Sequence, residues 1–166
     1  MNDDAAMQLV PRYRQRGLLL DTNLLLIWLV GQHRPAWIGK RRKLEAYNAD
    51  DLRRLRGFVG RFDQLLVTPA ILAEVSNLAL YTAYDHERAD LLRAFQALIN
   101  VLAERQPPSM EVADLPSFAW LGLPDATIEH IAKWRRAFIL SHDLDLVQQL
   151  QGQNLAALNF AYLRSQ

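Results

Sequence analysis

The chain has 166 residues, of which 51% are hydrophobic, and it contains no cysteine. This length suffices for one buried core, and the lack of cysteine excludes disulfides, thiolate zinc sites and a cysteine nucleophile. The 19 Lys and Arg residues nearly balance the 18 Asp and Glu residues, so the net charge of +1 neither favours nor excludes a nucleic-acid partner.

The same features predict compartment and domain organisation. A chain without cysteine suits the reducing cytoplasm, and the acidic N-terminus is not typical of a signal peptide. The most apolar stretch, residues 24–30, is too short to cross a membrane, so no membrane association is expected. We expect a flexible N-terminal segment over residues 1–16 and a single domain over residues 17–166.

Short apolar runs that end at polar residues predict buried strands in the first half of the chain. Residues 17–20 end at Asp21, and residues 65–67 end at Thr68 and Pro69, a pair typical of a helix N-terminus. Helices are expected from Leu24 through Val30, from Ala49 to about Phe62 behind an Asn48 cap, and from Pro69 through Glu74 and Asn77.

The second half of the chain alternates in the same way. Residues 87–103 carry apolar side chains at helical spacing and predict a packed helix, whose apolar face is a candidate homodimer surface. Pro124 is expected to begin a helix. Strands alternating with helices predict an α/β fold, a three-layer α/β/α sandwich with a mostly parallel central sheet. The other expected elements are strands over 110–113, 137–140 and 155–158 and a helix over 144–150.

Four acidic residues lie where this fold would gather them. Asp21 and Asp143 directly follow predicted strands. Glu74 lies about two turns into the helix after the second strand, and Asp125 lies in the first turn of the helix that begins at Pro124. Ligands of parallel sheets bind beyond the carboxyl ends of the strands, and converging carboxylates need a cation to offset their repulsion. All-oxygen ligation favours Mg²⁺ or Mn²⁺, which suits phosphodiester chemistry.

Each of these acids also has a simpler interpretation, because Asp at a strand end is often a turn former or a helix cap. Glu74 lies in a segment that is apolar around most of its circumference, so its side chain is expected to face inward. Asp145 is an alternative for the fourth acid and Asp114 for the third. Asp143 is preferred to Asp145 because it comes directly after the polar residues that end the strand.

Four segments, in this order, resemble the motifs of the PIN-domain nucleases, a family that includes the VapC-type toxins of bacterial toxin–antitoxin pairs. The match covers nearly the whole chain. The segments are residues 19–23 (LLDTN), 68–77 (TPAILAEVSN), 121–126 (LGLPDA) and 140–146 (LSHDLDL).

The resemblance implies an endoribonuclease that hydrolyses phosphodiester bonds of single-stranded or structured RNA with Mg²⁺ or Mn²⁺, and a protein antitoxin as partner if the chain is a toxin. Asp21, Glu74, Asp125 and Asp143 match the four acids of the family, as catalytic residues and metal ligands. The supporting polar residues are Asn23, Asn77 and Ser141. Family members commonly carry Thr where this chain has Ser141, which supplies the same hydroxyl, and His142 beside it is expected at the rim of the site.

A basic connection is the candidate surface for the nucleic-acid backbone. It consists of Lys40, Arg41, Arg42 and Lys43, with Arg53, Arg54 and Arg56 further along the chain. Trp37 and Tyr47 are interleaved with it and are candidates for stacking on an unpaired base. Basic residues at these spacings are also typical of an ordinary solvent-exposed helix face that binds no ligand.

Two other functions are compatible with the fold. One is a catalytically silent PIN-like protein-interaction or RNA-binding domain, but four unneutralised acids would then repel one another with nothing to offset the repulsion. The other is a phosphate-accepting signalling domain, which would need paired acids at the first strand and a Lys at the last. Here Asn159 follows the last predicted strand.

Overall fold

The computed structural model describes residues 1–165 and contains a five-stranded sheet in which every strand runs parallel to its neighbours. The strand order is β3-β2-β1-β4-β5, which confirms the expected α/β class with a parallel central sheet. The strands are β1 (Leu18–Leu20), β2 (Leu65–Val67), β3 (Ala103–Glu104), β4 (Phe138–Ser141) and β5 (Ala157–Asn159).

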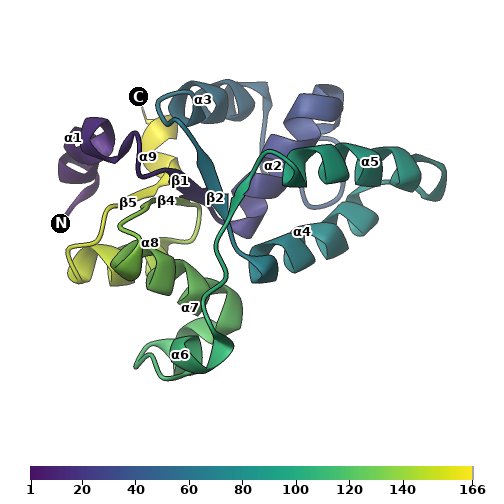
Figure 1. Cartoon of the computed structure of the whole chain (residues 1–166). Coiled ribbons are helices and arrows are strands. Elements are labelled where there is room, and N and C mark those ends of the chain that lie inside the picture. Colours follow the sequence, from purple (N-terminus) through teal and green to yellow (C-terminus); the bar gives the residue numbers. More distant parts are fainter. Residues whose placement is uncertain (166) are drawn as a thin grey trace.

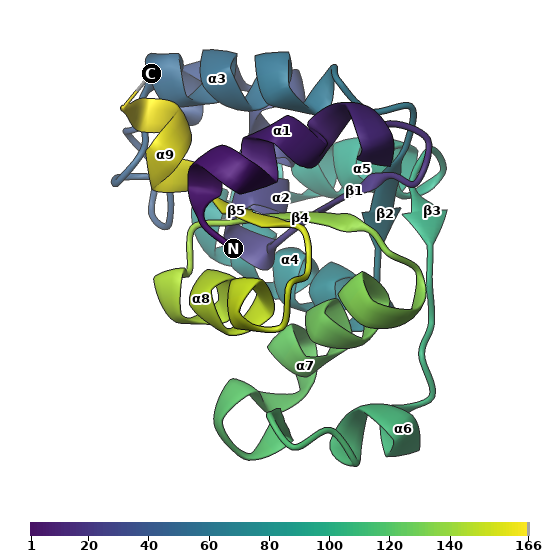
Figure 2. The same ribbon diagram turned by 90° about the vertical axis from the view of Figure 1, so that its left-hand side faces the viewer.

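Helices cover both faces of this sheet. Figure 2 shows α1 and α3 on one side of the strands and α7 and α8 on the other, which is the predicted three-layer arrangement. The helices are α1 (Asp3–Tyr13), α2 (Thr22–His33), α3 (Ala49–Val59), α4 (Pro69–Thr82), α5 (Arg88–Ile99), α6 (Ser109–Ala113), α7 (Phe118–Trp134), α8 (Leu144–Gly152) and α9 (Phe160–Arg164), with two short 3-10 helices, η1 (Pro35–Trp37) and η2 (Asp85–Glu87).

The central strand β1 fixes the register of its neighbours. Its three leucines are fully or almost fully buried, as expected for a strand covered on both faces. Leu20 lies opposite Leu140 of β4, and the backbone N–H of Asp21 extends the ladder by donating to the Leu140 carbonyl at 3.1 Å. The chain reverses its direction of winding between β1 and β4, which is where open α/β sheets form ligand sites.

Several expectations about local structure are wrong. Residues 1–16 are not an irregular segment, because Asp3–Tyr13 forms α1 behind an Asn2 cap and buries Ala6 and Val10. Residues 110–113 lie in helix α6 rather than in a strand, and the strand between α5 and α6 is the two-residue β3. Helix α3 ends at Val59, before the predicted Phe62.

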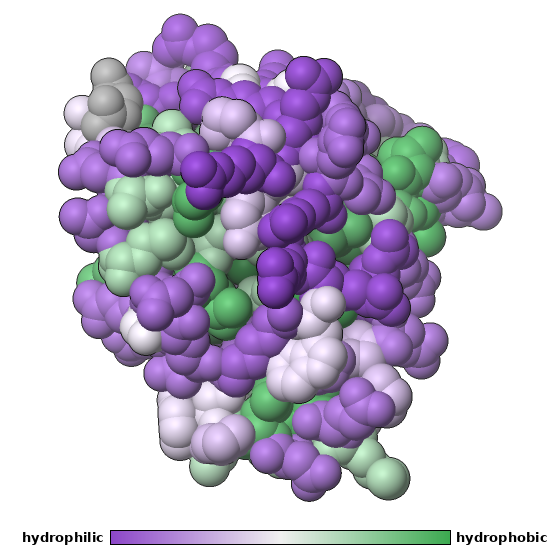
Figure 3. All heavy atoms as spheres, turned by 60° about the vertical axis from the view of Figure 1, so that its left-hand side comes forward, coloured by the Kyte–Doolittle hydropathy of each residue, from purple (hydrophilic) through white to green (hydrophobic). Residues whose placement is uncertain are grey.

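Within residues 1–165, no helix has the length and apolar character needed to cross a bilayer. The face of the molecule in Figure 3 is mostly hydrophilic, and its apolar residues gather in small separate areas. In Figure 1, α1 and the N-terminus lie at one end of the molecule and α5 lies at the other.

Candidate metal and nucleic-acid site

Asp21 is held rigidly at the carboxyl end of β1. Its side chain is 6% exposed and caps α2, because Oδ1 accepts from the Leu24 N–H at 2.8 Å. Oδ2 accepts from the Ser141 hydroxyl at 2.6 Å and from the His142 N–H at 2.7 Å. Burial raises the pKa of Asp21 above the usual value, although the hydrogen bonds from Ser141, Leu24 and His142 act in the opposite direction.

Ser141 connects the first and fourth acids. Its hydroxyl donates to Asp21 and accepts from the backbone N–H of Asp143 at 2.9 Å. Asp143 caps α8, because its Oδ1 accepts from the N–H groups of Asp145 and Leu146. The Asp143 side chain is exposed, and its Oδ2 accepts no hydrogen bond within residues 1–165. Asp21 and Asp143 therefore share one edge of the sheet.

Glu74 approaches the same edge from α4 through Thr22, whose hydroxyl donates to Glu74 Oε2 at 2.7 Å. Thr22 directly follows Asp21 in the chain. The expectation that Glu74 faces inward is wrong, because its side chain is exposed although its neighbours Ile71 and Val75 are buried. The apolar composition around Glu74 describes the buried side of α4, whereas Glu74 itself lies on the open side.

Asp125 is positioned by a break in α7. Gly122 has φ 69° and ψ 178°, so the helix that carries Asp125 begins afresh at Pro124, as the sequence predicts. Burial and the charges of Asp143, Asp21 and Glu74 raise the pKa of Asp125 to about 6. The other three acids therefore lie close enough to Asp125 to act on its charge, although they are far from it in the chain.

The chemistry of the four carboxylates suits a hard divalent cation, because they offer only oxygen ligands. In the observed side-chain conformations, however, they do not converge on one point. Within residues 1–165, no group of three or more acidic or histidine side chains is placed so that it could hold a metal ion. Glu74 and Asp143 are exposed and have room to turn, but turning would break the Thr22 hydrogen bond of Glu74 and the two cap hydrogen bonds of Asp143. Asp21 is fixed, and loading the site would require the other carboxylates to turn towards it.

Other buried acids of the protein are neutralised by basic partners. Asp51 is 1% exposed and accepts two hydrogen bonds from Arg164, at 2.8 and 2.9 Å. Glu129 is also 1% exposed and accepts from Lys133 at 2.6 Å. Asp21 differs from both, because no Lys or Arg among the described residues pairs with it. The sequence does not reveal the Asp51–Arg164 pair, whose members lie 113 positions apart.

The supporting residues have different surroundings. Ser141 contacts two of the acids, as described above, whereas Asn23 and Asn77 are exposed and make no side-chain hydrogen bond to an acid within residues 1–165. Asp145 lies in the first turn of α8, and Asp114 is the C-cap residue that follows α6. The Thr22 contact is the one that the sequence does not reveal, because Glu74 lies 52 positions further along the chain.

The aromatic candidates for base stacking are less open than expected. Tyr47 is buried, and its ring centroid lies 5.5 Å from that of His142, with its hydroxyl 3.4 Å from His142 Nδ1. Burial and the charge of Asp21 raise the pKa of Tyr47 to about 12, while Arg164 acts in the opposite direction. Tyr47 therefore supports His142 at the rim of the acid site and does not offer a free ring face. Trp37 is partly covered by Arg41, whose Cζ lies 4.6 Å from the ring centroid.

The basic connection divides into two kinds of residue. Arg41 is half-buried, pairs with Glu87 at 2.7 Å and lies over both Trp37 and Tyr84, so it is a structural residue. Lys40, Arg42 and Lys43 are exposed and have no ion pair within the described residues. Of the four predicted nucleic-acid contacts, Arg41 is therefore the one whose charge is already paired within the protein.

Comparison with known proteins supports the fold alone. No family model matches the chain, and no curated protein matches it. A solved structure, the crystal structure of PAE2754 from Pyrobaculum aerophilum, is similar with a TM-score of 0.51 and 17% sequence identity over 90% of each chain. At this identity the likeness shows a shared α/β architecture and carries no information about activity.

Proposed function

We propose that the protein is a divalent-metal-dependent nuclease that hydrolyses phosphodiester bonds of RNA, with Asp21, Glu74, Asp125 and Asp143 as its site. The observation that carries this proposal is the raised pKa of Asp125, to which the other three acids all contribute. An ionised carboxylate that is half-buried beside three other carboxylates, with no basic partner, destabilises a protein unless a cation offsets the charge. The resemblance to the PIN-domain nucleases supports the same assignment.

The four acids would have different roles towards a bound cation. Asp21 would be a fixed ligand, because three hydrogen bonds hold its two oxygens and Oδ1, which accepts only one of them, keeps a free lone pair. At pH 6 without a cation, Asp125 carries its proton in about half of the molecules, and a bound cation would favour the ionised form. Glu74 and Asp143 would have to turn from their exposed positions to reach the same cation. A bound Mg²⁺ or Mn²⁺ ion would supply Lewis-acid activation of water and neutralise the developing charge.

The cleanest test of this proposal is Asp125→Asn. No hydrogen bond to the Asp125 carboxylate is present within residues 1–165, so the amide removes charge without disturbing a donor. We expect the purified protein to cleave single-stranded RNA with Mg²⁺ or Mn²⁺, to stop with a chelator, and to lose roughly 100-fold or more of its rate in the variant. Cleavage of a labelled oligoribonucleotide measures this.

The matched control is Asp63→Asn, which removes the same charge before β2, at the opposite edge of the sheet, from a pair that Asp63 forms with Arg14 on the surface. Its rate should equal that of the unaltered protein. Equal rates for the Asp125 and Asp63 variants would refute the proposal. A metal-free RNA-binding or protein-interaction domain would then be the better description.

The toxin role rests on the resemblance alone, and we propose it as a special case of the nuclease. An antitoxin would be encoded by a small reading frame directly upstream, and co-expression of that frame should suppress RNA cleavage by the purified complex. If the upstream region encodes no small protein, the nuclease proposal stands without its toxin part.

A further inference from the structure

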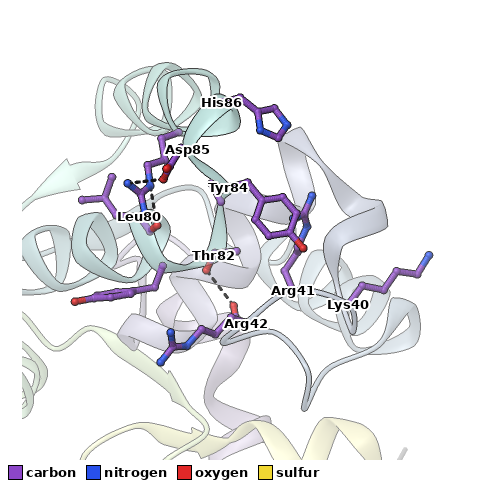
Figure 4. Close-up of a pocket in the computed structure, with 11 residues that line it drawn as sticks. Lys40, Arg41, Arg42, Leu80, Thr82, Tyr84, Asp85 and His86 are labelled. Carbon is purple, nitrogen blue, oxygen red and sulfur yellow. Dashed lines mark hydrogen bonds and ion pairs between the residues drawn. The ribbon is translucent and has the colours of Figure 1, made fainter.

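A basic and aromatic pocket lies at the far end of α4, away from the four acids. Its volume is about 640 Å³, and it lies between the connection that contains Lys40 and Arg42 and the turn from α4 to α5 (Figure 4). The turn contributes Tyr81, Tyr84 and Arg88. Sequence reasoning identified only the basic connection, because nothing in the pattern indicates that the α4–α5 turn lies against it.

The free positive charge of the pocket comes from two side chains. Arg41 is paired with Glu87, and Arg88 is paired with Asp85 at 2.9 Å while its Nε donates to the Leu80 carbonyl. Lys40 and Arg42 have no acidic partner among residues 1–165. The pocket therefore keeps a surplus of positive charge that an anionic ligand would neutralise.

The backbone of the basic connection is held in place next to the turn. The Thr82 hydroxyl donates to the Arg42 carbonyl at 3.2 Å, as Figure 4 shows. The Arg42 guanidinium lies 5.6 Å from the centre of the Tyr81 ring. Tyr81 is 61% exposed and Tyr84 is 62% exposed, which is unusual for large aromatic side chains in a folded protein. A ring beside a free cation is the combination that binds an unpaired base and its phosphate.

Helix α4 links this pocket to the acids. Glu74, Asn77 and Tyr81 follow one another at helical spacing, so they lie along one side of α4. Seven residues separate Glu74 from Tyr81, which is about 10 Å along a helix. A second hollow of about 450 Å³ shares Leu80, Tyr81 and Arg88 with the pocket and also includes Asn77, which lies about one turn from Glu74 on α4. The exposed side of α4 is thus a polar track between the acids and the pocket.

We propose that this pocket binds the flank of a single-stranded RNA, with phosphate on Lys40 and Arg42 and an unpaired base on Tyr81, while the strand follows α4 to the acid site. The inference rests on the proposed function for the position of the cut bond. The binding itself needs no cation and no intact acid site, so it is tested separately.

The experiment measures equilibrium binding of a short, labelled, single-stranded oligoribonucleotide by fluorescence anisotropy. The protein carries Asp125→Asn and the buffer contains a chelator, so that no cleavage occurs. We expect Arg42→Ala to weaken binding roughly tenfold and to reduce the slope of log affinity against log salt by about one. Tyr81→Ala should weaken binding roughly tenfold, whereas Tyr81→Phe keeps the ring and should bind like the unaltered protein.

Arg12→Ala is the matched control, because Arg12 is exposed on α1 at the other end of the molecule (Figure 1). Both test positions are exposed, and circular dichroism verifies that the variants fold. Equal affinities for the Arg42, Tyr81 and Arg12 alanine variants would overturn the inference even if the protein cleaves RNA. An effect of Arg42→Ala without one of Tyr81→Ala would overturn the base contact. Weakened binding by both, in a protein that never cleaves, would support the pocket and refute the nuclease.

Discussion

At the scale of single residues, the four acids differ in how firmly hydrogen bonds hold their side chains. Asp21 uses both carboxylate oxygens to accept hydrogen bonds, so an Asn at this position would turn its amide N–H groups towards a donor. Asp21→Asn therefore combines a loss of charge with a loss of stability. Asp125 makes no such contacts, and for this reason its charge can be studied in isolation.

The pH dependence of stability should reveal the raised pKa of Asp125. Below pH 3.8, the ordinary pKa of this group, the carboxyl is protonated in the folded and the unfolded state, so it costs no stability there. Between pH 3.8 and about 6 the unfolded chain ionises before the folded protein does, so stability falls with rising pH, and the loss is complete above about pH 6. Asp125→Asn should thus raise the free energy of unfolding by about 1 kcal/mol near pH 8, after allowance for solvent screening.

The same substitution should have almost no effect near pH 4. Urea unfolding at the two pH values, in the presence of a chelator, makes the comparison. An increase in the free energy of unfolding that is equal at pH 4 and pH 8 would show that helix propensity, and not charge, is the cause. Mn²⁺ at saturating concentration should shrink the gain near pH 8, because a bound cation offsets the same repulsion.

Sequence reasoning found the acids because each follows a strand end or begins a helix. It did not predict how exposed each acid is, or which side chains form hydrogen bonds with it. Glu74 was misplaced because apolar neighbours show only that a helix is packed, and not which of its residues faces the core. The roles of Ser141 and Thr22 depend on atoms brought together from segments 120 and 52 positions apart, which no local pattern records.

At the scale of secondary structure, the most consequential element is the broken helix α7. The backbone of Gly122 adopts φ 69° with ψ 178°, a conformation that is essentially restricted to glycine. The break lets Pro124 occupy the start of a helix, where its missing N–H costs nothing, and places Asp125 in the first turn. The position of the third acid therefore depends on a residue with no chemistry of its own.

Gly122→Ala should destabilise the protein by about 1–3 kcal/mol, through backbone strain alone, since no atom lies within 4 Å of the added Cβ. It should also weaken RNA cleavage by displacing Asp125. Gly57→Ala is the matched control, because it adds the same group to open space inside α3 and should stabilise the protein by about 0.5–1 kcal/mol. Thermal unfolding measures both, and equal effects of the two substitutions would contradict this account.

The elements that sequence reasoning found are those with strong local signals. Asn48 caps α3, Thr68 with Pro69 begins α4, and the leucines of β1 form a buried strand. The element that it missed is β3, which has only two residues and no apolar run. β3 exists because Ala103 pairs with Leu66 of β2, so its cause is tertiary.

At the scale of the whole molecule, the sheet is assembled from two parts of the chain. Strands β1, β2 and β3 come from the first 104 residues, whereas β4 and β5 come from residues 138–159. The two parts meet where β1 pairs with β4, and the hydrogen bonds between Asp21 and residues 141–142 lie at this junction. Neither part contains a complete acid site.

Fragments 1–106 and 107–166 should therefore be inactive and poorly folded when prepared separately. Each would expose the side of a strand that is buried in the intact sheet, and the first would also leave Asp21 without its Ser141 partner. Mixing the fragments should restore both helical circular dichroism and RNA cleavage. Cleavage by fragment 1–106 alone would show that Asp125 and Asp143 are dispensable.

The pairing of β1 with β4 also sets the time at which the site can first exist during synthesis. A ribosome adds about 5–20 residues per second, so Asp21 emerges several seconds or more before Ser141 and the His142 amide that fix its orientation. Until β4 has left the exit tunnel, the nascent chain holds Asp21 and Glu74 without the contacts that organise them. If the protein is the nuclease proposed above, it stays inert on its own messenger RNA until β4 pairs with β1, in the final part of translation.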